Sequence, residues 1–173
     1  MEIAKGPVNF SEEILTDSFI SDVTPLLEHH FAEISANPDL LLDPDWLAYG
    51  RIQESGSLRI FTARDKVRGD GVTSLVGYAV FIVNYNPHYR SSLQAVQDVL
   101  FIDKAHRRGG VGYKFIKWCD SRLESDGVQV VYHHIKAKHN FGKLLERQGY
   151  ELVDLIYQKR LDGGAAQVVE EVA

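Results

Sequence analysis

The segment that decides the fold is Arg107-Arg108-Gly109-Gly110-Val111-Gly112, which lies between an apolar strand pattern and an amphipathic helix pattern. Three glycines within four residues allow the backbone to approach a ligand closely. The free amides of a helix's first turn, together with the positive end of its dipole, favour an anion there. Because the two arginines add positive charge, the segment has the chemistry of a pyrophosphate-binding turn.

Other interpretations of this glycine-rich turn can be weighed against an anion site. A Walker loop requires Lys and then Ser or Thr after its last glycine, whereas Tyr113 follows Gly112. A dinucleotide-binding fingerprint requires G-x-G-x-x-G at the start of a parallel sheet, which this segment does not provide. The glycines could also simply make a tight turn between a strand and a helix, and the six residues alone leave that alternative open.

Upstream of the turn, the sequence predicts two helices. The first carries one apolar face, made by Ile20, Val23, Leu27, Phe31 and Ile34. It begins either at Pro25, with Thr24 as N-cap, or near Asp17 with Pro25 inside it. Asp43-Pro44 predicts the start of the second helix, as an N-cap and a first-turn proline, and that helix should end before Gly56.

Three strands should follow these helices. Residues 58–63 and 75–83 predict a hairpin, 84–92 a loop, and 93–102 a third strand. Strict alternation would put five side chains on one face of this third strand: Gln94, Val96, Asp98, Leu100 and Ile102.

Downstream of the turn, the period becomes helical from Val111 to Leu123, and Asp126-Gly127 should end that helix. A strand at 128–135, a helix at 140–148 and a final strand at 150–161 complete the pattern. The order predicts an α/β (α+β) fold, a mixed layer with helices on both faces. We expect one domain over residues 1–162 and a flexible tail over 163–173.

The composition of the chain excludes several classes of function. The 173 residues are 45% hydrophobic and carry a net charge of −5, which favours one water-soluble domain and argues against a protein that grips nucleic-acid phosphates. The lone Cys119 excludes an intramolecular disulfide and any cysteine-based zinc cage, and no two-His-plus-carboxylate spacing suggests another metal. With no signal peptide or membrane-length apolar run recognised, we expect a cytoplasmic protein that does not bind membranes.

The string from Ile102 to Gly112 resembles the acyl-CoA-binding signature of the GNAT superfamily of N-acetyltransferases, R/Q-x-x-G-x-G/A, met here by Arg107, Gly110 and Gly112. The later run 144–150 resembles the family's L-Y-x-K-x-G-F close, and the run 139–142 is similar to phage-encoded members. The resemblance covers most of the chain. It implies a central, mixed, mostly antiparallel sheet flanked by helices and splayed between the fourth and fifth strands.

The resemblance also implies acetyl-CoA (CoA) as the cofactor. The amides of the glycine-rich turn would hold the pyrophosphate, with positive charge from the arginines; the residues are Arg107, Arg108, Gly109, Gly110, Val111 and Gly112. The strand edge at Leu100, Phe101 and Ile102 would pair with the pantetheine arm through main-chain hydrogen bonds. Asn140 or Lys143 would reach the pantetheine or phosphate end, unless they are a plain helix cap and a solvated charge.

An attacking amine must lose a proton, so the site needs a base. Asp98 is the first candidate, because many family members carry an acidic residue at this place, four residues before Ile102. His134, whose neutral form suits a base near pH 7, is the second. Leu145 stands where the family has its usual general acid, a tyrosine. Either the thiolate leaves unassisted, or Tyr113 or Tyr157 substitutes, or catalysis is lost.

Acceptor recognition is expected from the first helix, the loop after it and the segment 84–92. The chief candidates are His29, Tyr49, Tyr85 and His88, supported by Glu28, His30, Trp46 and Tyr89. Together they suggest a polar, aromatic-walled pocket for an amine acceptor, a small molecule or a protein. A catalytically silent acyl-CoA-binding or protein-binding module is the alternative function. An enzyme acting on charged tRNA is disfavoured by the acidic balance, and a homodimer is an open alternative for assembly.

Overall fold

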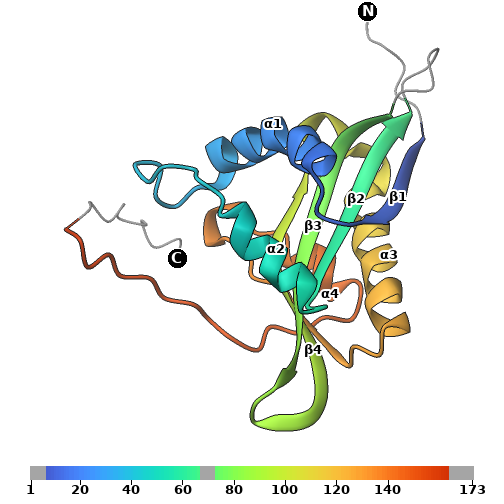
Figure 1. The fold of residues 1–173 in the computed structure, drawn as a ribbon, viewed down its shortest axis with the longest axis vertical. Coiled ribbons are helices and arrows are strands. Elements are labelled where there is room, and N and C mark those ends of the chain that lie inside the picture. Colours follow the sequence, from blue (N-terminus) through green and yellow to red (C-terminus); the bar gives the residue numbers. More distant parts are fainter. Residues whose placement is uncertain (1–6, 67–72, 164–173) are drawn as a thin grey trace, which may run out of the picture.

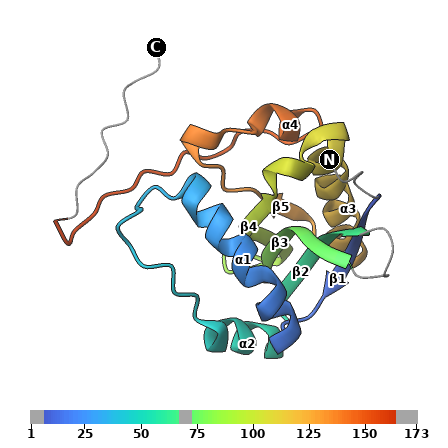
Figure 2. The ribbon, with the colours of Figure 1, turned by 90° about the horizontal axis from the view of Figure 1, so that it is seen from above.

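The computed structural model describes residues 7–66 and 73–163. One five-stranded sheet runs in the order β1 (Val8–Glu13), β2 (Leu58–Lys66), β3 (Thr73–Asn86), β4 (Tyr89–Ile102) and β5 (Val130–Tyr132). Strands β1 to β4 pair antiparallel, and β5 runs parallel to β4. The helices are α1 (Asp17–Ile34), α2 (Trp46–Glu54), α3 (Val111–Ser125) and the short α4 (Gly142–Glu146). Helices α1 and α2 cover one face of the sheet and α3 the other (Figures 1 and 2), so the predicted fold class is confirmed.

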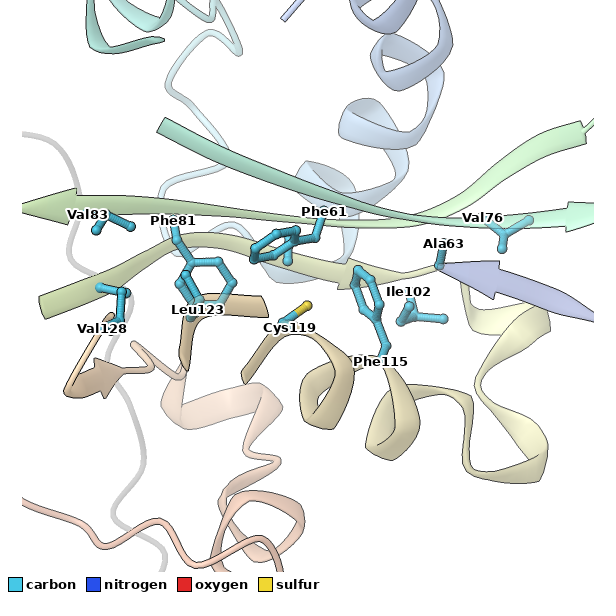
Figure 3. Close-up of a cluster of buried hydrophobic side chains, with 12 residues drawn as sticks. Phe61, Ala63, Val76, Phe81, Val83, Ile102, Phe115, Cys119, Leu123 and Val128 are labelled. Carbon is cyan, nitrogen blue, oxygen red and sulfur yellow. The ribbon is translucent and has the colours of Figure 1, made fainter. Parts of the chain in front are cut away.

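The core beneath α3 is the larger of two apolar layers. Phe115, Cys119 and Leu123 recur every four residues and so share one face of α3, each at most 1% exposed. They pack against Phe61 and Phe81 of the sheet (Figure 3). Burying this stripe gives α3 a fixed position, and with it the glycine-rich turn at its N-terminus.

The second layer lies under α1. Phe19, Val23 and Leu26 pack against β2 and β3. Thr16 caps this helix by accepting a hydrogen bond from the Phe19 amide. Pro25 lies inside the helix. Of the two predicted starts, the one near Asp17 is therefore the one that forms.

A β-bulge in β4 changes the expected facing of its side chains. Val80 pairs with Val99 but Phe81 pairs with Gln97, which leaves Asp98 as an extra residue. Leu100 consequently packs into the α3 layer, whereas Val99 packs into the α1 layer. The prediction that Asp98 shares a face with Leu100 and Ile102 was wrong, because the inserted residue breaks the alternation between them.

Three other predictions were corrected, and one strand was not predicted at all. Strand β1 was missed, since its pattern is short and largely polar. The expected loop 84–92 is the end of a hairpin, because β3 and β4 continue as polar strands beyond the core. The second helix is capped by Asp45 rather than Asp43. Residues 150–161 do not pair as a strand within the described chain; beyond Tyr150 they run extended (Figure 1) and are mostly exposed. Near their end, Arg160 donates two hydrogen bonds to Asp39.

Two further expectations concern the ends of the chain and membranes. The predicted tail, 163–173, lies outside the described residues except for Gly163. Within the residues described, no helix has the length and apolar character needed to cross a bilayer.

Candidate active site

The site begins where two strands part. Main-chain pairing of β4 with β5 covers three residue pairs and stops at Val96 and Tyr132. The next contact between these strands is made by side chains: His133 Nδ1 lies 2.6 Å from Gln97 Oε1. From Gln97 to Ile102, β4 has no partner strand on this side among residues 7–66 and 73–163. This is the splay between the fourth and fifth strands that the resemblance implies.

Asp98, the extra residue of the bulge, faces α2 at this point. The Tyr49 hydroxyl donates to its carboxylate over 2.5 Å. Burial, and then the bond to Asp98, raise the pKa of Tyr49 far above its usual value. The phenol therefore keeps its proton and remains a hydrogen-bond donor that holds the carboxylate in place.

Asp98 and His134 line the same cavity, of about 380 Å³, at the end of the β3–β4 hairpin. Tyr85 and Gln94 also line it. His133 and His134 directly follow β5 and differ in burial: His133 is half-buried against Gln97, and His134 is exposed. The fold thus brings together both candidate bases and two of the candidate acceptor residues, Tyr85 in this cavity and Tyr49 at the Asp98 carboxylate.

A second and larger cavity, of about 500 Å³, lies between α1, the loop 35–45, α2 and the sheet. Tyr49 and Val99 form part of its wall. Because the Tyr49 hydroxyl bonds to Asp98, the Asp98 carboxylate stands one hydrogen bond from this cavity.

The glycine-rich turn lies at the far end of β4, before α3. Gly109 and Gly110 both have left-handed backbone, with φ of 72° and 73°, and Gly110 is the N-cap of α3. No side chain caps the helix. A Cβ built on Gly109, Gly110 or Gly112 would meet no protein atom within 4 Å. The first-turn amides of this 15-residue helix are therefore uncovered on the glycine side, which suits an anion.

The two arginines of the turn differ in their contacts. Arg107 makes two hydrogen bonds to Glu33, of 2.6 and 2.8 Å, and donates to the Ile102 carbonyl. Its guanidinium also lies over the Phe101 ring. Arg107 therefore ties the turn to α1, and its charge is balanced there. Arg108 is exposed and has no ion pair among the described residues, so it is the cation available to a ligand.

Comparison with known proteins decides the fold family. No protein-family model and no curated protein matches the sequence. Solved structures do match. Ribosomal-protein-alanine N-acetyltransferase from Brucella melitensis biovar Abortus 2308 superposes with a TM-score of 0.61 at 18% identity, covering 90% of this chain and 99% of the other. The chain has the GNAT acetyltransferase fold.

Two further GNAT structures match similarly. One is an aminoglycoside acetyltransferase from an uncultured soil metagenomic sample, in complex with sisomicin. Its TM-score is 0.63 at 15% identity, covering 88% of this chain and 97% of the other. The other is a predicted acetyltransferase from Clostridium acetobutylicum with acetyl-CoA. Its TM-score is 0.64 at 8% identity, covering 90% of this chain and 97% of the other.

The remaining sequence candidates lie away from the two cavities. His29 is exposed on α1, 3.9 Å from Asp103, and His88 lies in the turn between β3 and β4. The Asn140 side chain accepts the Gly142 amide, as a local cap does, and Lys143 is exposed on α4. Leu145, at the place of the GNAT tyrosine, is 5% exposed and packs into the protein.

One hydrogen-bonded series of polar side chains in the interior was not predicted from the sequence. Beyond Gln97, His133 Nε2 lies 3.2 Å from the Tyr150 hydroxyl, which donates to Asp120 over 2.6 Å. Burial lowers the pKa of His133 to about 4 and raises that of Asp120. These four residues come from β4, α3, the segment after β5 and the segment after α4, so no local sequence motif predicts them. Their hydrogen bonds connect α3 to the point where β4 and β5 separate.

Proposed function

We propose that the protein is an acetyl-CoA-dependent N-acetyltransferase that acts on a primary amine. The observation that carries the proposal is the position of Asp98, in the bulge where β4 and β5 part, with Tyr49 fixing its carboxylate and His134 lining the same cavity. The GNAT fold supports acetyl transfer as the reaction, and the Clostridium acetobutylicum neighbour with acetyl-CoA supports the donor.

The residues present fit acetyl-CoA. The uncovered amides of the turn 108–112 would hold its pyrophosphate, and Arg108 would add charge. The edge of β4 from Gln97 to Ile102 carries main-chain groups without a partner strand on the β5 side in the described chain, and these would pair with the pantetheine amides. Arg107 would contribute by holding the turn against α1 through Glu33 rather than by touching phosphate.

The chemistry requires one proton transfer and one bond exchange. Acetyl-CoA supplies a thioester carbonyl whose C–S bond breaks as the C–N bond of the amide forms. Asp98 accepts the proton that the attacking nitrogen loses, and Tyr49 holds the carboxylate in position while it does so. His134 is the second titratable group of the same cavity and the alternative proton acceptor.

A catalytically silent acyl-CoA-binding module is the second candidate function. Leu145 favours it, because no phenol projects from α4 to protonate the leaving thiolate. Neither Tyr113, in the first turn of α3, nor Tyr157, which is 91% exposed on the extended segment, lines either cavity. In the enzyme, the thiolate therefore leaves unassisted, which its low basicity permits.

Two measurements test the proposal in sequence. A melting shift of several degrees with acetyl-CoA is expected, since a ligand at one hundred times its Kd stabilises by about 2.7 kcal/mol. Absence of a shift at millimolar acetyl-CoA would remove the cofactor assignment. Thiol release is then measured across a panel of amines for the parent, Asp98→Asn and His134→Ala. Binding without thiol release from any amine would favour the silent module.

A further inference from the structure

The larger cavity is apolar over most of its wall. Its apolar lining comes from α1, the loop 35–45, α2 and strands β2 to β4, and includes Phe31, Ile34, Leu42, Trp46, Val80 and Val99. Its volume of about 500 Å³ lies within the range of small-molecule sites. The polar pocket expected from the sequence does not describe this wall, although aromatic side chains do line it.

The polar groups inside the cavity are already paired and carry no charge near neutral pH. His30 Nδ1 lies 2.9 Å from the Tyr78 hydroxyl, and the His30 ring stacks on Phe101. Burial lowers the pKa of His30 to about 4, so the imidazole is neutral at pH 7. Among the described residues, a ligand body placed here meets no charged side chain in the interior, and the two polar pairs at the wall, His30 with Tyr78 and Tyr49 with Asp98, are already hydrogen-bonded.

Charged side chains line the cavity only where they are exposed. Asp43 and Asp45 precede α2, and Lys136 follows β5. Asp45 already accepts the Ala48 amide as the cap of α2. An amine carrying several ammonium groups would have to leave most of them unpaired in the apolar interior, at a large desolvation cost. An amine with one ammonium and one apolar body would not.

We propose that the acceptor is a primary amine with a single neutral apolar body, aryl or alkyl, which fills this cavity. The amine end would then lie at the wall formed by Tyr49 and Val99, beside Asp98. This inference rests on the proposed function for the chemistry at the amine, but the binding of the apolar body can be measured without it.

The same apolar volume could also receive the chain of a longer acyl-CoA. The position of the cavity favours the acceptor. The cavity lies on the face of the sheet that α1 and α2 cover. Acetyl-CoA would instead bind along the free edge of β4 and at the glycine-rich turn. The test therefore contains one arm with amines of increasing apolar size and one with acyl-CoAs of increasing length.

The amine arm compares hexylamine and 2-phenylethylamine with ethylamine, glucosamine and spermidine, at fixed acetyl-CoA. The expected result is kcat/KM at least tenfold higher for the two apolar amines than for the other three. Equal or higher kcat/KM for spermidine or glucosamine would overturn the inference. In the acyl arm, a rate that rises from acetyl-CoA to hexanoyl-CoA would assign the cavity to the acyl chain and overturn it as well.

Two leucines, one in the cavity wall and one outside it, provide a pair of matched variants. Leu42 lines the cavity and is half-buried, whereas Leu47 is exposed on α2 and lines neither cavity. Leu42→Asn should raise KM for 2-phenylethylamine about tenfold and leave KM for acetyl-CoA unchanged; Leu47→Asn should change neither. Equal effects of the two substitutions would contradict the assignment, and melting curves identify a variant that fails to fold.

A binding measurement separates this inference from the proposed function. Trp46 lies in the cavity wall, so 2-phenylethylamine should change the tryptophan fluorescence of the parent saturably, and about tenfold more weakly in Leu42→Asn. This binding is expected even if no thiol is ever released, and that outcome would overturn the proposed enzymatic function while supporting the apolar site. Thiol release from other amines, without any binding of 2-phenylethylamine, would support the enzymatic function and overturn the apolar site.

Discussion

His133 and Gln97 are joined through their side chains at the first position where β4 and β5 no longer pair through the main chain. The bond lies in the interior, with Gln97 only 6% exposed. A side-chain contact thus ends the ladder and sets where the two strands begin to separate.

His133→Ala should destabilise the fold. The change leaves the buried Gln97 amide and the Tyr150 hydroxyl without one partner each, which costs about 1–3 kcal/mol per unsatisfied group. Urea denaturation measures the loss. The adjacent His134→Ala is the control: its side chain is exposed, so its free energy of unfolding should stay within about 0.5 kcal/mol of the parent. Equal losses in both variants would mean that the bond to Gln97 contributes nothing.

Stability should fall as the solution is acidified from about pH 6.5 to pH 4. Burial lowers the pKa of both His30 and His133 to about 4, against an ordinary value of 6.5. Between these values the unfolded chain binds protons that the folded chain does not, so acidification favours unfolding, by up to about 3 kcal/mol for each imidazole. Denaturant titrations at several pH values test this.

The control for that pH dependence is the pair of variants His30→Gln and His133→Gln. Each removes one imidazole, so the slope of unfolding free energy against pH should flatten between pH 6.5 and 4.5. Carboxylates such as Glu13, whose pKa the hydrogen bond from Arg64 lowers, lose their contribution at lower pH. Burial raises the pKa of Asp120, which acts with the opposite sign, but Asp120 is present in the parent and in both variants, so the comparison still isolates the imidazoles. A slope unchanged in both variants would show that neither imidazole is buried in its neutral form.

Asp98→Asn should lower kcat by about a hundredfold or more, because the proton acceptor is removed while the side-chain volume is kept. Tyr49→Phe should lower it less, by about tenfold, since the carboxylate remains but loses its fixed orientation. Steady-state thiol release measures both. Tyr89→Phe, an exposed tyrosine at the hairpin end of β4 that lines neither cavity, should retain full activity. Parental rates in Asp98→Asn would transfer the role of base to His134.

Gly110→Ala should weaken acetyl-CoA binding. Gly110 has φ of 73°, and its missing side chain leaves the amides at the start of α3 uncovered. Gly127→Ala is a matched control, since Gly127 has φ of 84° and follows the other end of α3. Both variants should lose about 1 kcal/mol of stability from backbone strain. Calorimetry should show at least tenfold weaker acetyl-CoA binding for Gly110→Ala alone. Comparable affinities in the two variants would mean that the glycine-rich turn only connects β4 to α3 and does not bind the pyrophosphate.

The parts of the fold that sequence patterns predicted are those that local rules determine. The stripe Phe115, Cys119 and Leu123 follows from helical period, and the glycine-rich turn from its composition. The facing of Asp98 did not follow, because a bulge depends on how β4 registers against β3 across the sheet. The contact of Tyr49 with Asp98 joins residues far apart in sequence, and so does the apolar cavity. The candidate bases could be named from sequence, whereas the apolar character of the cavity proposed for the acceptor depends on how α1 and α2 pack on the sheet.

The bulge at Asp98 has a consequence for how this fold tolerates change. Leu100 and Val99 anchor β4 in opposite apolar layers, and the pairs Val80–Val99 and Phe81–Gln97 fix that arrangement on either side of the extra residue. Exchanging the side chain of residue 98 would leave both layers packed, and deleting the residue would let Val99 follow Gln97 in regular alternation. The side chain at position 98 can therefore be replaced, by mutagenesis or in evolution, without repacking either apolar layer.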